Sequence, residues 1–196
     1  MLEKAYDHYK ETCAICREQV KERNVLFLKM LLSLAGMFLL MMQTNEAMQI
    51  FVSYMKEKYK CNVTFPANLI STLIWIVLLY YTLGYYRISI NLERQYSYIH
   101  KLENAINRMI GQLQGQYAGF RIEREGKAYL KRYPKLLDAA DFIYKTVFPG
   151  IYLVLVILGG WKRYTGEPEL FASIQMGIAI CCVILTILFM VEIRRE

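Results

Sequence analysis

The sequence predicts an all-α membrane protein with four transmembrane helices and a helical cytoplasmic layer between spans 2 and 3. Hydrophobic residues make up 56% of its 196 residues, whereas a soluble domain has about 45–50% apolar residues. The excess lies in four runs, at residues 25–42, 69–86, 142–161 and 170–191. A helix needs about 20 mostly apolar residues to cross a bilayer, so each run is long enough for one span.

Lys and Arg residues are concentrated on one side of the predicted membrane. Segments 1–24, 87–145 and 192–196 carry five, eleven and two of them, whereas segments 43–66 and 162–169 carry three and two. Loops on the cytoplasmic side hold the excess of Lys and Arg. Both termini are therefore predicted to be cytoplasmic, with residues 192–196 forming a short cytoplasmic tail.

Residues 1–24 are predicted to form a cytoplasmic helix, because they mix five basic with five acidic residues and contain no Gly or Pro. The apolar residues of this segment leave an irregular stripe: Leu2, Ala5, Tyr9, Ile15 and Val20. Such a helix either lies against the membrane or a partner helix, or is a solvated entry into the first span. The lone Cys13-x-x-Cys16 pair would need two further ligands to hold zinc, so we expect two spectator thiols.

The first transmembrane pair covers residues 25–86, with an outer loop at 43–66 that contains a short amphipathic helix. Lys29 lies about one turn inside the first span, with Ser33 on the same helical face. Lys29 either extends to the interface or sits at the mouth of a pore. Gln175, in the fourth span, needs a hydrogen-bond partner and should face inward. These three residues are the pore candidates.

Residues 87–141 form the predicted cytoplasmic layer. No helix breaker follows the second span until Gly111, so its helix should continue to about Leu113. Apolar residues recur there at spacings of four and three, interrupted by Glu103: Leu92, Tyr96, Ile99, Ile106, Ile110 and Leu113. This heptad pattern predicts a seam that needs a partner. We favour copies of the chain, which makes it an oligomer seam; the alternative is the helix after Glu125 in the same chain.

The same layer carries a dense basic cluster next to several glycines. Its cations are Arg121, Arg124, Lys127, Lys131, Arg132 and Lys135, with aromatic residues between them. Cations bind phosphates and aromatic rings stack on bases, so the cluster is a candidate site for a nucleotide or single-stranded nucleic acid. The alternative is contact with the anionic headgroups of the lipid bilayer.

The second transmembrane pair covers residues 142–191. Pro149 and Gly150 lie near the start of its first span. Proline removes a backbone donor and kinks a helix, so these residues are either a structural kink or a hinge that couples the cytoplasmic layer to the spans.

The sequence offers no catalytic motif. It has two histidines, His8 and His100, and no acidic residue within any of the four apolar runs. His100 shares a face with Glu103, but no second pair completes a metal site. We therefore expect no enzyme activity, no metal and no cofactor.

The order of these features resembles that of small bacterial membrane proteins that act as effectors in anti-phage defence. The resemblance includes the helix LERQYSYIHKLE at 92–103 and the stretch REGKAYL at 124–130. It is closest in layout to the channel-type effectors of Hailong systems, with the membrane subunit of Kiwa systems as a second candidate. The resemblance implies a homo-oligomer in the bacterial inner membrane, with a tetramer as our guess, that breaches the membrane when a nucleotide signal changes. It also implies a soluble defence partner.

Two functions are consistent with these expectations. The first is an oligomeric channel or pore controlled by an anionic ligand at the basic layer. The second is a non-conducting anchor that recruits a soluble cytoplasmic partner through the same layer.

Overall fold

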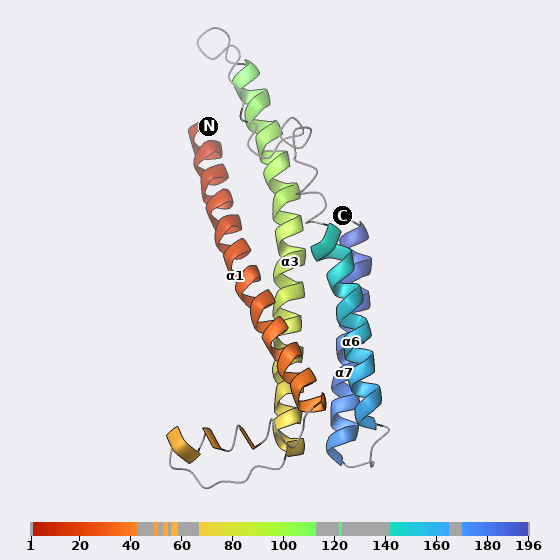
Figure 1. Ribbon diagram of the computed structural model, residues 1–196. Helices are drawn as coiled ribbons and strands as arrows, with labels where there is room; N and C mark the ends of the chain where they lie inside the picture. The colour runs from red at the N-terminus through yellow and green to blue at the C-terminus, as the bar shows by residue number, and fades with distance from the viewer. Residues whose placement is uncertain are drawn as a thin grey trace.

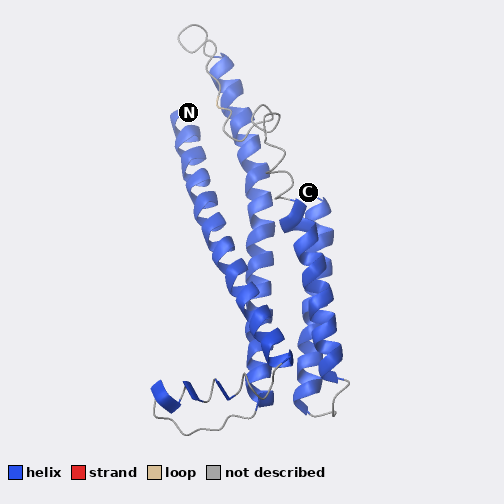
Figure 2. Cartoon of the chain, in the orientation of Figure 1, coloured by secondary structure: helices blue, strands red, loops and turns tan. Residues whose placement is uncertain are grey.

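The computed structural model describes residues 2–42, 49–50, 53–54, 56–58, 67–112, 122, 142–164 and 170–195. Its elements are the helices α1 (Leu2–Met42), α3 (Ala67–Gln112), α6 (Phe148–Tyr164) and α7 (Leu170–Arg195), with a π-helical turn, η1 (Ile143–Val147), before α6. Apart from Ile122, every described residue is helical (Figure 2). Four helices are long and apolar enough to cross a membrane. This confirms the predicted all-α class with four spans.

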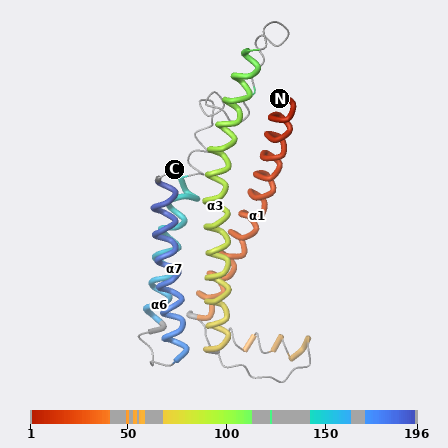
Figure 3. The backbone as a smooth tube through the Cα atoms, turned by 180° about the vertical axis from the view of Figure 1, so that it is seen from behind, coloured from red at the N-terminus to blue at the C-terminus, as the bar shows by residue number. Residues whose placement is uncertain are grey.

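The molecule has two parts (Figure 1). All four helices pack side by side over their apolar lengths, and we call this part the bundle. α1 and α3 then project together beyond α6 and α7 on the side where both termini lie, as the view from behind also shows (Figure 3). We call the paired lengths that lead into this projection and form it, residues 2–24 of α1 and 88–112 of α3, the rod, and its side of the bundle the rod side. The first turns of the rod, up to Glu93 and Arg94 of α3, still lie beside η1 and α7.

α1 and α3 continue from the bundle into the rod without interruption. The segment predicted to be helical at 1–24 is, from Leu2 onward, the first part of α1, which enters the first span without a break and runs for 41 residues, and α3 runs for 46 residues. α3 ends at Gln112, close to the predicted end at Leu113, which lies outside the described residues. Gly84 does not break α3. A Cβ atom there would lie 3.3 Å from a methyl of Leu26, so its small size lets α1 approach closely.

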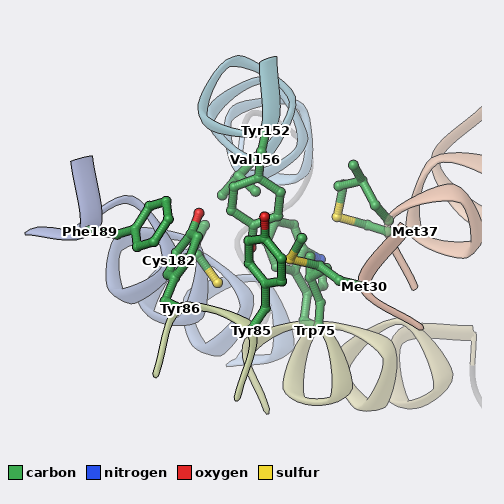
Figure 4. Close-up of a cluster of buried hydrophobic side chains, with 12 residues drawn as sticks. Met30, Met37, Trp75, Tyr85, Tyr86, Tyr152, Val156, Cys182 and Phe189 are labelled. Carbon is green, nitrogen blue, oxygen red and sulfur yellow. The ribbon is translucent and has the colours of Figure 1, made fainter. Parts of the chain in front are cut away.

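The bundle core is filled by side chains from all four helices. Figure 4 shows them meeting at one centre: Met30 and Met37 from α1, Trp75, Tyr85 and Tyr86 from α3, Tyr152 and Val156 from α6, and Cys182 and Phe189 from α7. Several are fully buried, including Met30, Tyr152 and Val156. The space between the four spans of one chain is therefore a packed core.

The tyrosines at the rod-side end of the second span lie in two different surroundings. Tyr80 is 69% exposed, as expected for an interfacial residue, whereas Tyr85 and Tyr86 are buried in the core. Residues five apart on an α-helix point about 140° away from each other, since each residue turns the helix by about 100°. Tyr80 and Tyr85 therefore cannot both face the interface. Tyr86 stacks on Phe189 with ring centroids 4.2 Å apart.

Candidate functional site

The rod is held together by an apolar seam along one face of α3. Leu92, Ile99 and Ile106 are each 1% exposed, and Ile110 is also buried. Tyr96 packs against them as a half-buried residue, and Leu113 lies outside the described residues. These are the heptad positions that the sequence identifies, so the seam forms where the spacing predicts it.

The partner of this seam is α1 of the same chain. Tyr9, Cys13 and Cys16 of α1 pack into the same buried cluster as Leu92 and Ile106. Among the described residues the seam is thus covered by an element that the sequence did not suggest, whereas a second copy and the helix after Glu125, which lies outside the described residues, stay predictions. α1 covers the seam because α1 and α3 leave the bundle side by side, which places the apolar face of α1 against the seam of α3. A second copy can cover the seam only if α1 is displaced.

The two cysteines are the signal that sequence reasoning missed. Counted as apolar residues, they complete the stripe of α1 as Leu2, Ala5, Tyr9, Cys13, Cys16 and Val20, and all six lie in or against the cluster. This spacing of three and four is the spacing of the seam itself. Ile15, which the sequence reading placed in the stripe, is 45% exposed. Buried Cys behaves as a small hydrophobic residue.

Three polar contacts join α1 to α3 across the rod. The Tyr9 hydroxyl donates to Oε1 of Glu103 at 2.9 Å, and the Cys16 thiol donates to Oε1 of Gln95 at 3.0 Å. Nearer the surface, Nε2 of His8 lies 2.9 Å from the hydroxyl of Tyr98. Because each contact depends on one alignment of the two helices, together they specify the register of the rod.

Glu103 is the exception in the heptad pattern, and it is 2% exposed. Burying a carboxylate is unfavourable unless hydrogen bonds replace water. Tyr9, in the polar part of α1, provides one of these bonds. Burial, and then the hydrogen bond to Glu103, raise the pKa of Tyr9 well above its ordinary value. The phenol therefore keeps its proton and remains the donor.

Two ion pairs connect α3 to the second helix pair where α3 leaves the bundle. Nζ of Lys145, in η1, lies 2.7 Å from Oε1 of Glu93. Nη2 of Arg94 lies 3.0 Å from Oε1 of Glu192, in α7. We call these four residues the collar. Lys145 and Glu192 thus each make an ion pair with α3 where it enters the rod.

Aromatic contacts between α1 and the start of the second helix pair adjoin the collar. Phe27 of α1 packs edge-on against Phe148 of α6, with ring centroids 4.6 Å apart, and against Tyr144 of η1 at 5.3 Å. Pro149 follows at once, and the preceding turn is a π-helix in which Phe148 donates to the carbonyl of Ile143. Proline has no donor for the carbonyl four residues earlier, and π turns are frequent at functional sites. The hinge role of Pro149 and Gly150 stays a prediction.

The predicted basic cluster lies outside the described residues: Arg121, Arg124, Lys127, Lys131, Arg132 and Lys135. Ile122 is described, and it lies between the first two of these cations in the sequence. Its amide donates to Oδ1 of Asn107 at 2.8 Å, and its carbonyl accepts from Nδ2 of Asn107 at 2.9 Å. This paired contact attaches Ile122 to the side of α3.

The three pore candidates occupy two different places. Lys29 is exposed on the outer side of α1, and Ser33 is half-buried beside it. Gln175 is fully buried between α7 and α3, where its amide donates to the Thr72 hydroxyl at 2.8 Å. Gln175 therefore faces inward with a hydrogen-bond partner, as its position in the span predicts. Within one chain the three residues do not line a common surface.

Comparisons with protein-family models, with curated proteins and with solved structures give no match for this chain. The resemblance to Hailong and Kiwa membrane proteins therefore stays a prediction. What the structure establishes is a multi-pass helical membrane architecture in which a two-helix rod is continuous with two spans and joined to the other two by a collar.

Proposed function

We propose that this protein is a channel-type membrane effector, made of several copies, in which a cytoplasmic signal at the rod changes the arrangement of the spans. The single observation that supports the proposal best is the continuity of α1 and α3. Each is one unbroken helix in both the rod and the bundle. A long helix transmits displacement of one end to the other, because its backbone hydrogen bonds leave no joint at which the motion is lost.

The collar and the aromatic contacts couple the rod helices to the second helix pair. The ion pairs Glu93–Lys145 and Arg94–Glu192 connect α3 to η1 and to α7. Phe27 connects α1 to the start of α6. A shift of the rod therefore acts on the second helix pair at the level of Pro149, where the predicted hinge lies.

The proposed signal is an anionic ligand, a nucleotide or an oligonucleotide, bound by the basic cluster. The observation that supports this is the contact between Asn107, near the end of α3, and Ile122, which lies between Arg121 and Arg124 in the sequence. We expect ligand binding at the basic cluster to displace α3 near this end, from which the displacement is transmitted along most of the helix.

Ion flux from dye-loaded liposomes tests the proposal. The purified chain is reconstituted, and nucleotides and short oligonucleotides are added on the rod side. We expect flux with the correct ligand, and loss of both ligand binding and flux after charge reversal of Arg124, Lys127 and Lys131. If no ligand and no substitution at Pro149 produces flux, the channel proposal is wrong.

The collar provides a matched test of coupling. Glu93→Lys reverses one member of an ion pair and should abolish flux while ligand binding at the basic cluster is retained, because Glu93 is not part of that cluster. The exchange Glu93→Lys with Lys145→Glu restores opposite charges at the same positions and should restore flux. Equal behaviour of the single and double variants would show that the collar does not couple the two helix pairs.

A membrane anchor for a soluble partner is the second candidate. The observation that favours it is the closure of the seam within one chain, since copies are then not needed to cover it. In this case the rod is a self-contained element available to another protein. Pull-down after charge reversal of Arg124, Lys127 and Lys131 separates the candidates. Loss of a protein partner supports the anchor, whereas loss of a bound nucleotide supports the channel.

A further inference from the structure

A groove of about 430 Å³ lies between α1 and α3 on the outer surface of the bundle. One end is polar and is formed by Lys29, Ser33 and Tyr81. The rest is apolar and includes Leu32 and Leu73, which are more than half exposed. The groove is separate from the rod, the collar and the packed core.

The polar end of the groove carries a cation, Lys29. Nζ of Lys29 lies 5.6 Å from the centre of the Tyr81 ring, and among the described residues Lys29 makes no ion pair. A cation within about 6 Å of a ring face is stabilised modestly. This leaves the charge of Lys29 available to an anion.

The length of the groove matches one leaflet of a bilayer. It extends along α3 from Tyr81 to Ile70, which at 1.5 Å per residue is roughly 16 Å. The hydrocarbon core is about 30 Å thick, so the groove is about as long as the acyl layer of one leaflet, and its polar end with Lys29 and Tyr81 is the end nearer the rod. Gly36 widens the apolar part, since a Cβ atom there would meet only a methyl of Ile74 at 3.9 Å.

We propose that this groove binds one anionic phospholipid of the rod-side leaflet, with its phosphate on Lys29 and an acyl chain along the apolar part. Charge complementarity favours this occupant over a second copy of the chain docked through the same face. A symmetric contact would bring two Lys29 ammonium groups together in a medium of low dielectric constant, where like charges repel strongly. The proposal assigns Lys29 and Ser33 to lipid instead of a pore mouth, and it is independent of whether the protein conducts.

Native mass spectrometry of the full chain in detergent tests the proposal, with phosphatidylglycerol and phosphatidylcholine as probes. We expect phosphatidylglycerol to be preferred. Lys29→Gln should reduce this preference roughly fivefold, the effect of about one cation near an anionic membrane surface. Gly36→Leu should reduce retention of both lipids, because the added side chain occupies the apolar part while Lys29 remains.

Lys162→Gln is the matched control. It removes the same charge at the far end of α6, which is also exposed, and should leave lipid preference unchanged. The proposal fails if Lys29→Gln behaves like Lys162→Gln. It also fails if Gly36→Leu leaves lipid retention unchanged but alters the number of chains per particle, since a second copy would then occupy the groove. Circular dichroism verifies that the variants retain their helical content.

Discussion

The rod and the bundle use the same two helices, α1 and α3, in different ways. In the rod the pair closes a narrow seam whose centre holds a buried carboxylate, Glu103, hydrogen-bonded to Tyr9. In the bundle the pair packs against α6 and α7 around large aromatic residues and Met side chains. Polar contacts there are between uncharged groups, such as Thr82 with Tyr152 at 2.7 Å and Gln175 with Thr72 at 2.8 Å.

This difference follows from the surroundings of each part. In water, burial of apolar side chains drives two helices together. In lipid this driving force is absent, and close packing with hydrogen bonds between helices replaces it. We therefore expect truncation of apolar residues to be most damaging in the rod, and loss of a neutral hydrogen bond in the bundle to have a smaller effect.

The largest effect is expected from Ile99→Ala in the rod. Ile99 is 1% exposed in the seam, and truncating a buried Ile lowers stability by about 2–5 kcal/mol. Hydrogen exchange of the rod amides measures this loss as faster opening. Ile15→Ala is the matched control, because Ile15 is on the same rod but 45% exposed. Equal exchange in the two variants would mean that the rod is not closed on this seam.

A smaller loss is expected from Tyr9→Phe, which removes the donor to buried Glu103. A hydrogen bond to a charged group contributes about 1.5–3 kcal/mol, so opening of the rod should accelerate by about tenfold or more in hydrogen exchange. Tyr6→Phe removes a hydroxyl from a tyrosine that is 39% exposed, and it should have little effect. If both variants open alike, the contact between Tyr9 and Glu103 does not stabilise the rod.

In the bundle, Gln175→Leu should destabilise less than either rod substitution. It removes the bond to Thr72, but Oε1 of Gln175 makes no hydrogen bond within the described helices, so burial of an unpaired acceptor is relieved. Hydrogen bonds between transmembrane helices contribute about 0.6 kcal/mol on average. Reversible unfolding in mixed micelles measures the change, with exposed Ser173→Leu as the control. A loss of stability greater than that caused by Tyr9→Phe would contradict the expectation that such substitutions are less damaging in the bundle than in the rod.

The smallest effect on stability is expected at the collar. Glu93 and Lys145 are about 30% exposed, and ion pairs accessible to water contribute less than about 1 kcal/mol. Glu93→Gln should shift the unfolding midpoint slightly in low salt and hardly at all in high salt, because salt screens exposed charges. A large shift that persists in high salt would show that the collar is a principal support of the fold.

Local features of the sequence determined the number of spans, their extents and the end of α3. Run length and hydropathy set a span, and the absence of helix breakers between the second span and Gly111 extends α3 to Gln112. The heptad spacing likewise identified which residues of α3 form the seam. These properties depend on residues within a few turns of each other, so no tertiary information is needed to read them.

The tertiary structure alone decided what each face meets. The partner of the seam is α1, about 90 residues earlier, as in the contact between Tyr9 and Glu103. The inward positions of Tyr85 and Tyr86, the collar, and the groove at Lys29 likewise depend on which helix lies beside which. A periodic pattern shows that a face must be covered, but the covering element is set by how all four helices share a limited apolar surface.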